Sequence, residues 1–600
     1  MKKFLLILTV AVSFIACHQE YDIPIPPKER EVLPAPTRIE RYPSLLLNDS
    51  LMVLGEQLEN PYALDVMQEA RAQLLAENPG MSIPAITSPS HYYVRFAPAN
   101  DDELYTLLQD TTVHFYDFPL DREVISGVYY HDPAIADSLP TYQYASIPVE
   151  QWVRDYAESN ISREILEYLF IPEDEEEFFG GGGDDDGDGN WWDNGNITPI
   201  IPENPWIPAL PGDEEINPNT ITLSPENIID MLVDKALYLT GNLDSDSDTS
   251  TQSVAGTNSS SSAWTPSGRI TAYDDIAGGQ IPLEGVKVHA RRWFTTYTGI
   301  TNADGYFTCD GTFKKPANYC IKWERAYLDI REGYVGQAYY NGPKQSTEWN
   351  LDITSDSEKS LRYATIHRAA YRIYYGNING LMRPGHTRKE KISYFHRECW
   401  TNNINGSYYS YQLGAGIVSD VRIFGKNSNG WSPMSQIFST TCHELGHVIH
   451  CVYTPSRYHN AETRYLEAWA RCFQYYITQL EYQDLGVLHN LNIVSEGKNN
   501  ITPDHDYNFQ LWNKAYHNHD YPVIFVDVID NYNQSNSLIN PEHPYPNDNV
   551  HYNGIKSLES IVLNSTTFDE VREKLILKSN SLTHGLNAND INTLFDYYEY

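Results

Sequence analysis

The stretch TTCHELGHVIHC, residues 440–451, combines residue types and a spacing that suit metal chemistry. His443 and His447 lie four positions apart, so on a helix their imidazoles share one face and can converge on one ion. Glu444 is rotated about one residue from that face, where its carboxylate can reach a water molecule on the metal. The pattern predicts a zinc (Zn2+) site at which Glu444 takes a proton while water attacks a carbonyl group.

The surrounding residues predict the helix that this geometry requires. Ser432 followed by Pro433 is typical of a helix start, with Ser432 as the N-cap. Apolar residues then recur with the 3.6-residue period between positions 434 and 452, and Pro455 ends the pattern. Both histidines therefore fall well inside one amphipathic helix.

A catalytic zinc ion needs a third protein ligand. His450 lies two helical turns from His443, about 10 Å along the axis, so it cannot bind the same ion, and we expect it at the surface or beside the ligands. Glu467 lies in the next predicted helix, for which Asn460 is a candidate N-cap. Its neighbours are apolar, and a carboxylate in such surroundings is costly unless it is paired or metal-bound. Small Ala470, one turn on, would let the two helices approach closely.

The pattern His443-Glu444-x-x-His447 with Glu467 resembles the gluzincin metallopeptidases, and its spacing is similar to that of thermolysin. The resemblance implies zinc bound by His443, His447 and Glu467, with Glu444 as general base. It also implies that GAGIVSDVRIFG, residues 414–425, holds the substrate backbone.

Two related patterns differ from this sequence. The metzincin pattern requires Gly at 450 and His at 453, whereas the chain has His450 and Tyr453. The thermolysin pattern places an Asp shortly after the ligand Glu, where it orients the first histidine. The chain has Ala470-Arg471 there, so another group must orient His443.

A fourth role is to stabilise the oxyanion of the tetrahedral intermediate. DNVHYNGI, residues 548–555, resembles the thermolysin-like segment that carries this donor, which implies His551. His517, His519 and Tyr552 remain alternatives. The remaining C-terminal residues have helical periodicity, as a helical subdomain closing a cleft would have.

Length and charge narrow the class of protein. Six hundred residues are too many for one hydrophobic core, so several domains are expected. The formal net charge is −38 and no cluster of Lys and Arg occurs, which argues against nucleic acid as a partner. The same charge disfavours binding to the surface of anionic lipid.

The N-terminus predicts export. MKKFLLILTVAVSFIAC has two lysines and an apolar run too short to span a bilayer, as a cleaved signal has. Cys17 after a small residue resembles a bacterial lipoprotein box, which implies acylation of Cys17 and a lipid anchor in the membrane. The alternative is an ordinary secretory signal with an incidental cysteine. We expect an extracytoplasmic protein, at the cell surface or in the periplasm.

The rest of the chain predicts a multidomain α+β protein. We expect a signal peptide (1–17), a tether (18–45) and an N-terminal α/β module (46–172) with a strand, a helix near 100–109 and a second strand. A linker with one short helix (173–264), a β-sandwich (265–353) and a zincin-type metallopeptidase domain (356–600) follow.

The linker contains one candidate calcium site. Asp184, Asp186, Asp188 and Gly189 match positions one, three, five and six of a calcium loop. The twelfth position is Gly195 where a bidentate Glu belongs, so a solvated flexible linker is the favoured interpretation and Ca2+ the lesser one.

The segment 265–353 resembles the carboxypeptidase regulatory-like, transthyretin-type domain. The matching residues are Gly268-Arg269-Ile270, Pro282-Leu283-Glu284-Gly285-Val286 and Thr301-Asn302-Ala303-Asp304-Gly305-Tyr306-Phe307. The resemblance implies a two-sheet accessory module without chemistry of its own. Cys309 and Cys320 are the most plausible local disulfide, across an expected hairpin.

Together these features predict a lipid-anchored, extracytoplasmic zinc endopeptidase that cleaves extracellular proteins or glycoproteins. Two alternatives remain. One is a surface-binding lipoprotein with an inactive zincin domain. The other is a zinc hydrolase of non-peptide amides.

Overall fold

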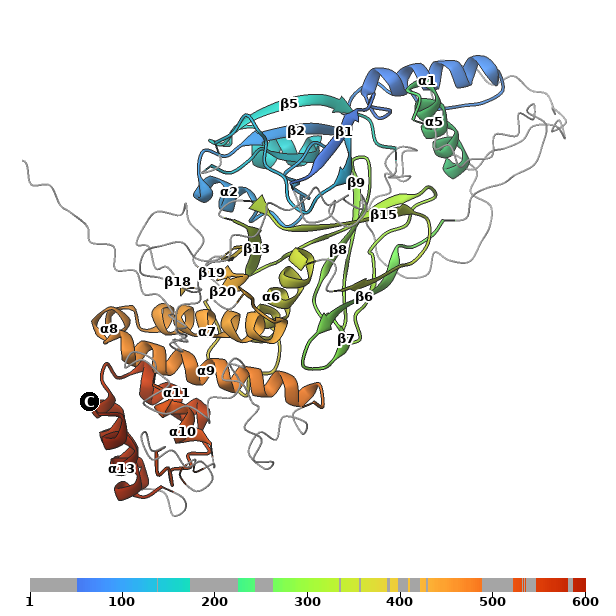
Figure 1. Ribbon diagram of the computed structural model, residues 1–600. Coiled ribbons are helices and arrows are strands. Elements are labelled where there is room, and N and C mark those ends of the chain that lie inside the picture. Colours follow the sequence, from blue (N-terminus) through green and yellow to red (C-terminus); the bar gives the residue numbers. More distant parts are fainter. Residues whose placement is uncertain are drawn as a thin grey trace, which may run out of the picture. The chain divides into compact units, whose positions relative to one another are not determined.

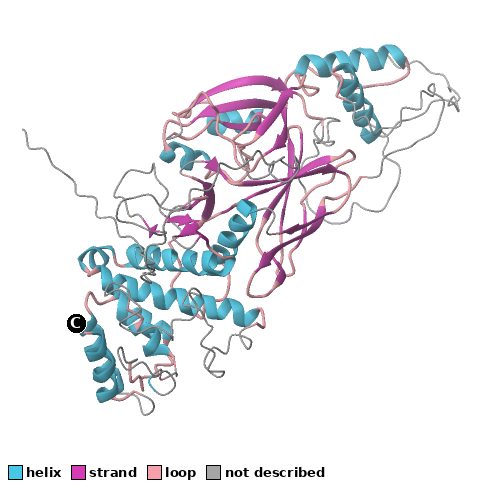
Figure 2. Cartoon of the chain, viewed as in Figure 1, coloured by secondary structure: helices cyan, strands magenta, loops and turns pink. Residues whose placement is uncertain are grey.

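The computed structural model shows a mixed α+β chain (Figures 1 and 2). The residues it describes are 51–136, 139–172, 225–242, 263–333, 336–354, 358–385, 389–397, 408–409, 421–427, 430–487, 522–530, 533, 535, 546–580 and 586–599. Cys17, the candidate calcium residues Asp184, Asp186, Asp188 and Gly189, and His517 and His519 lie outside these ranges. Within them, no helix combines the length and apolar character needed to cross a membrane.

The chain divides into two compact units. One comprises Met1–Gly55, Phe96–Tyr144 and Ser261–Tyr600, and the other comprises Glu56–Arg95 and Ala145–Ser260. The expected N-terminal module, residues 46–172, is therefore not a single unit. Its expected second strand forms only an isolated bridge between Tyr116 and Tyr144, and the Tyr116 hydroxyl bonds to Thr296 and His289 of the C-terminal part.

The unit that contains Glu56–Arg95 is built on a helix pair and a small sheet. Helix α1 (Leu64–Glu77) packs against α5 (Pro225–Leu239), the short helix expected in the linker, and Lys235 pairs with Glu77 at 2.5 Å. The sheet has the order β4-β2-β5, with β2 at His91–Ala97, β4 at Gln143–Pro148 and β5 at Ser162–Leu169.

Short elements complete the N-terminal part of the chain. Helix α2 (Asp101–Leu107) forms where it was predicted, because the Asn100 side chain accepts a hydrogen bond from the Glu103 backbone N–H at 2.9 Å. The others are β1 (Val53–Gln57), which pairs with β3 (Arg122–Ser126), then α3 (Val149–Gln151) and the single π-helical turn η1 (Trp152–Tyr156).

Residues 267–353 form two four-stranded sheets around a shared core. One contains β10, β6 and β16 in that order, with β7 also on β6; the other has the order β15-β11-β8-β9. Buried Ile270, Phe307 and Ile321 belong to the same core cluster. The bounds are β6 Ser267–Asp274, β7 Gly279–Pro282, β8 Lys287–Arg292, β9 Thr295–Ile300, β10 Tyr306–Thr308, β11 Ala317–Lys322, β15 Tyr339–Gln345 and β16 Trp349–Ile353.

The expected disulfide between Cys309 and Cys320 is wrong, because both thiols are free and buried. The expected hairpin does not form: β10 pairs with β6, whereas β11 pairs with β8 and β15 in the other sheet. Burial raises the pKa of the Cys320 thiol to about 11, so the thiol stays protonated and unreactive at neutral pH.

A third sheet joins the two-sheet segment to the region that contains His443 and His447. Its order is β12-β13-β17-β19-β18, with β14 also on β13; β13, β17 and β19 are parallel. The bounds are β12 Glu324–Arg325, β13 Leu328–Glu332, β14 Gly336–Gln337, β17 Glu390–Phe395, β18 Tyr408–Tyr409 and β19 Val421–Phe424. Strands from inside the expected accessory module thus build the sheet of the expected catalytic domain. The short ribbon of β20 (Lys426–Asn427) and β21 (Gly430–Trp431) follows.

Helices cover this region, as Figure 1 shows for α6, α7 and α9. The predicted C-terminal helices are confirmed. The bounds are α6 Glu358–Tyr374, α7 Met434–Tyr453, α8 Pro455–Asn460, α9 Thr463–Asp484, α10 Ile524–Ile529, α11 Ile555–Leu563, α12 Phe568–Ser579 and α13 Ala588–Tyr598.

Both predicted N-caps of the two central helices are wrong. Pro433, not Ser432, precedes α7, and the cap comes from another element: the Asp275 carboxylate accepts bonds from the Ser435 backbone N–H and hydroxyl, each at 2.7 Å. Asn460 is the last residue of α8, and Glu462 precedes α9.

Candidate metal centre

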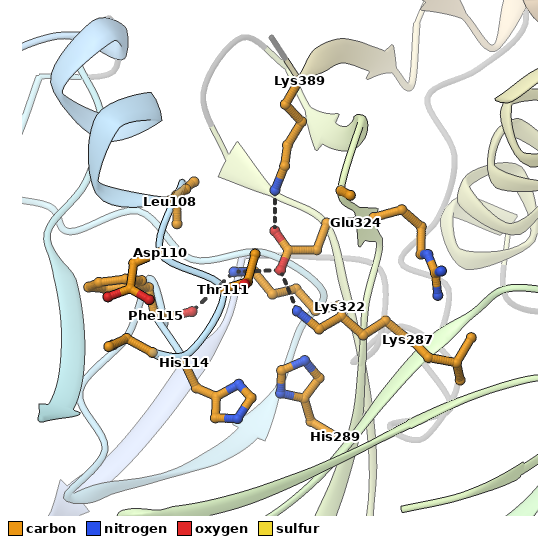
Figure 3. Close-up of a pocket in the computed structure, with 14 residues that line it drawn as sticks. Leu108, Asp110, Thr111, His114, Phe115, Lys287, His289, Lys322, Glu324 and Lys389 are labelled. Atoms are coloured by element: carbon orange, nitrogen blue, oxygen red, sulfur yellow. Dashed lines mark hydrogen bonds and ion pairs between the residues drawn. The ribbon is translucent and has the colours of Figure 1, made fainter. Parts of the chain in front are cut away.

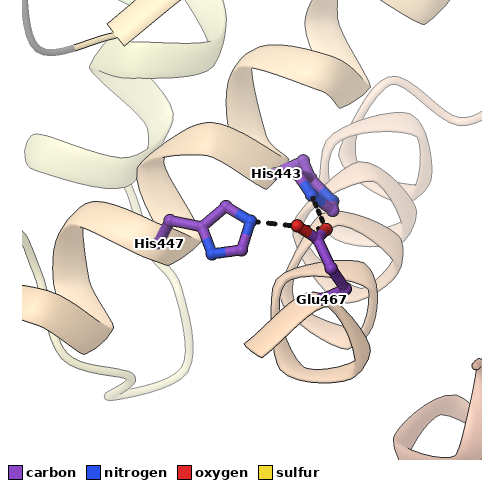
Figure 4. A group of neighbouring side chains, drawn as sticks. All are labelled: His443, His447 and Glu467. Carbon is purple, nitrogen blue, oxygen red and sulfur yellow. Dashed lines mark hydrogen bonds and ion pairs between the residues drawn. The ribbon is translucent and has the colours of Figure 1, made fainter. Parts of the chain in front are cut away.

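Two packed helices bring three of the predicted residues together. His443 and His447 come from α7 and Glu467 from α9, and one ligand atom of each lies within 4.8 Å of the others (Figure 4). Glu467 Oε2 is 3.0 Å from His443 Nε2 and 3.5 Å from His447 Nε2. The three side chains therefore converge from two directions on one point.

The close approach of α7 and α9 depends on small residues. A Cβ atom added at Gly446 would lie 3.4 Å from the Ala470 Cα atom and 3.3 Å from the Phe473 ring. This contact confirms the predicted role of Ala470. It lets a side chain as short as glutamate reach the histidines of the other helix.

The cluster is buried, and burial affects its charges. Burial lowers the pKa of His443 to about 4 despite the Glu467 carboxylate beside it, so the ring is neutral at pH 7. Burial alone would raise the pKa of Glu467, but the two histidines hold it well below its usual range. For His447, burial lowers the pKa and the Glu467 carboxylate raises it, with a net increase.

Gln474 contacts the cluster and was not predicted from the sequence. Its side-chain oxygen lies 3.0 Å from His443 Nδ1 and occupies the orienting role for which the sequence offered no Asp. It stands on the same helix as Glu467, two turns further along. Metal-bound histidines usually donate their second ring N–H to such an acceptor.

The donor set fits zinc. The two nitrogens of His443 contact two oxygens, Gln474 Oε1 and Glu467 Oε2, but a neutral imidazole has only one N–H. With that proton on Nδ1, the Nε2 lone pair and the Glu467 carboxylate face each other and repel. A cation bound by both atoms would remove this repulsion. Zinc ligands about 2.0–2.1 Å from the ion are about 3.3 Å apart in a tetrahedron, close to the two distances measured to Glu467.

Glu444 lies on the same helix, is fully buried and stays outside the group of three. Its negative charge contributes to the raised pKa of His447, so the carboxylate lies close to the cluster. A base that acts beside a bound metal would need to lie close to its ligands in this way.

His450 is not at the surface, contrary to one of the expectations. It is fully buried against the rings of Tyr458 and Tyr465, and neither ring nitrogen has a hydrogen-bond partner among the described residues. Burial lowers its pKa to about 3. Consistent with its distance along the helix, it is not part of the three-residue cluster.

The structure does not bring His551 into the cluster. His551 Nδ1 lies 2.6 Å from the backbone oxygen of Asp530, and because a carbonyl only accepts, Nδ1 carries a proton. A neutral ring of this tautomer has no proton on Nε2, so His551 could donate to an oxyanion only as an imidazolium. The hydroxyl of its alternative, Tyr552, donates to Ser557 at 2.7 Å.

Strand β19 contains the last residues of the expected substrate-binding segment, Val421–Phe424, and lies between β17 and β18. Residues 414–420 of that segment are outside the described ranges. In the sequence comparisons, the chain matches no known family model and no curated protein.

Proposed function

We propose that the protein is a zinc-dependent endopeptidase related in mechanism to the gluzincins. The observation that supports this proposal is the convergence of two imidazole nitrogens and one carboxylate, on two helices, beside a buried glutamate. Two nitrogen ligands and one carboxylate are a common donor set of catalytic zinc, which keeps a further position for water or substrate.

Each residue then has a defined task. When bound, zinc supplies a lowered pKa for its water and polarises a carbonyl group. His443, His447 and Glu467 hold the ion, and Gln474 fixes the ring orientation of His443 by accepting its Nδ1 proton. Glu444 accepts a proton during attack and returns it to the leaving amine.

The location and substrate class belong to the same proposal. A signal-like N-terminus with Cys17 supports a lipid anchor in a bacterial membrane and an extracytoplasmic site of action. An extracellular protein or glycoprotein is the corresponding substrate.

The test compares the chain lacking residues 1–17 with its Glu444→Gln variant on a complex extracellular protein mixture. New peptide termini are mapped by mass spectrometry. Cuts should appear with the unchanged residue and fall at least about 100-fold with Gln, because a positioned base contributes ~10²–10⁴ in rate. Zinc content, measured by elemental analysis, should stay the same in Glu444→Gln and fall in Glu467→Gln.

Identical terminus maps from both proteins, each carrying zinc, would contradict the peptidase and favour hydrolysis of non-peptide amides or a binding role. Absence of zinc from the unmutated protein, even after incubation with zinc, would contradict the metal centre itself. An exposed-residue variant, His459→Gln, serves as a control for both measurements.

A further inference from the structure

A second group of charged side chains lines a cavity of about 350 Å³ in the compact unit that contains the metal centre (Figure 3). The cavity lies among residues of the 108–115 segment and of β8, β11 and β12. Ile300, which is 43% exposed, also lines it, so the cavity is open to solvent. The volume is within the ~300–1,000 Å³ range of small-molecule sites.

Three ammonium groups converge on one carboxylate in this cavity. Glu324 Oε1 lies 3.0 Å from Lys287 Nζ and 3.3 Å from Lys322 Nζ, and its Oε2 lies 3.2 Å from Lys389 Nζ. Arg325 lines the cavity as well, and Asp110 is the second carboxylate of the lining. Three ammonium groups therefore share one carboxylate, in a protein whose formal net charge is −38.

This excess of positive charge is not on the surface. The Lys322 and Lys389 side chains are only 4% and 10% exposed. Burial lowers the pKa of Lys322 although Glu324 opposes that effect, whereas the lysines hold the pKa of Glu324 well below its usual range. Asp117 also acts to raise the pKa of Lys322, and for Lys389 the charges of Glu324 and Asp329 outweigh burial and raise its pKa. Neither aspartate lines the cavity, and the carboxylate in contact with the three ammonium groups is that of Glu324 alone among the described residues. Burying three ammonium groups against one carboxylate is costly unless another anion completes the site.

A buried hydrogen-bonding group also lines the cavity without a protein partner. His289 is 2% exposed; its Nδ1 lies 3.2 Å from the Tyr116 hydroxyl, and its Nε2 has no hydrogen-bond partner among the described residues. Burial, followed by the charge of Lys287, holds its pKa well below the usual value, so the ring is neutral. When the Tyr116 hydroxyl donates to Nδ1, Nε2 carries a proton that it can donate to a ligand.

Leu108, Val113, Phe115, Ile300 and Ala326 form an apolar part of the wall, and Thr111 and His114 complete the lining. We propose that this cavity binds a small organic anion, with its carboxylate or phosphate against Lys287, Lys322 and Lys389 and its apolar body against this wall. The site is separate from the three-residue metal cluster, and its occupation does not depend on peptidase activity.

The experiment uses isothermal titration calorimetry on the chain lacking residues 1–17, with benzoate, phenyl phosphate and the neutral benzamide as probes. At least one of the two anions should bind at least about 10-fold more tightly than benzamide, since the three share a ring and differ in charge. Comparison of benzoate with phenyl phosphate identifies which anionic group the lysines prefer. Equal binding of all three, or no saturable binding of either anion, would overturn the proposal.

Variants locate the binding. Lys389→Gln should weaken the preferred anion about 10-fold or more, whereas Lys344→Gln, a 37%-exposed lysine of β15, should leave affinity within about 2-fold. Lys287→Gln, at a more exposed position of the same group, replaces Lys389→Gln if that variant does not fold. Anion affinity that is unchanged in the folded variant would overturn the assignment to this cavity.

Discussion

His443 contacts an amide oxygen on one ring nitrogen and a carboxylate oxygen on the other. Since a neutral ring has one proton, only one of these contacts is an ordinary hydrogen bond. In the zinc site proposed above, the Gln474 oxygen would accept the Nδ1 proton, which would leave Nε2 to face the ion. A neutral amide would then perform the task that the thermolysin pattern gives to an aspartate.

Gln474→Ala should weaken zinc binding about 10–100-fold, because loss of an outer-shell acceptor has that effect in other zinc sites. Competition with a chromophoric chelator measures the affinity. Gln483→Ala, an exposed glutamine at the end of the same helix, should leave it unchanged. Equal zinc affinity of Gln474→Ala and the unmutated protein would show that the amide does not select the tautomer.

The spacing of His443 and His447 predicted that they share one helix face, and the apolar neighbours of Glu467 together with the gluzincin resemblance predicted the third side chain. It did not predict Gln474, since an amide two turns beyond Glu467 has no distinguishing pattern. It also misplaced His450: spacing excludes it as a ligand of the same ion but says nothing about Tyr458 and Tyr465, which bury it.

His367 of α6 should make stability depend on pH. Its Nε2–H donates to the Glu284 carbonyl at 3.0 Å, and burial lowers its pKa to about 4. Between pH 6.5 and about 4 the unfolded chain binds a proton that the folded chain does not, so the free energy of unfolding falls as pH falls through this window. The full effect is of the order of 3 kcal/mol, at ~1.4 kcal/mol per pKa unit.

Thermal melts across this pH range should show a smaller decrease in melting temperature for His367→Gln than for the unmutated protein. His459→Gln, at an exposed site, is the control and should follow the unmutated protein. Loss of zinc at low pH affects all three proteins alike, so the difference between them isolates His367. Parallel melting curves for all three would contradict the prediction.

At the level of the elements, the candidate metal centre depends on the contact between α7 and α9. Glycine at 446 and alanine at 470 bring the helices close, and Asp275, next to the end of β6, caps the start of α7. The adjacent Asp274 accepts hydrogen bonds from Arg368 of α6 and Tyr482 of α9. The end of β6 and the residue that follows it therefore contact α6, α7 and α9.

Gly446→Val should separate α7 from α9. Its branched side chain would overlap Ala470 and Phe473, and overpacking of this kind costs ~1–3 kcal/mol. Because Glu467 moves with α9, zinc affinity should fall together with melting temperature. Gly80→Val, at a position with nothing within 4 Å of the added Cβ atom, is the matched control. Unchanged zinc affinity in folded Gly446→Val would show that the helix spacing does not determine the site.

Helix positions were predictable from periodicity, but their caps were not. The Asp275 cap of α7 comes from a residue far away in the sequence, whereas a sequence pattern indicates only caps from neighbouring residues such as Ser432. The same limit explains the wrong disulfide prediction for Cys309 and Cys320. Their proximity in sequence suggested a hairpin, but β10 and β11 pair with strands of two different sheets.

At the level of the whole molecule, the expected boundary near residue 355 does not separate two independent domains. Strand β13, inside the expected accessory module, is the parallel neighbour of β17, with five residue pairs from Leu328–Glu390 to Glu332–Tyr394. The sequence could not reveal the pairing of β13 with β17, because the residues of β13 have the same pattern as the other short strands of the expected sandwich.

Residues 356–600 alone should therefore fail to fold cooperatively. The fragment lacks β13 and the Asp275 cap, so β17 loses one of its two neighbours and buried Ile392 and Tyr394 lose part of their cover. Calorimetry should show no sharp transition for the fragment and a clear one for residues 51–600. A fragment that melts sharply and binds zinc would show that the shared sheet is dispensable.

The shared sheet also imposes an order on biogenesis, because the chain is made from its N-terminus. When β16 has been synthesised, every strand of the two-sheet segment is available. The strand β17, which pairs with β13, has not yet been synthesised. During that interval β13 presents an unpaired edge, which is a template for mispairing with a second nascent chain. The yield of correctly folded protein thus depends on how quickly residues up to 395 follow.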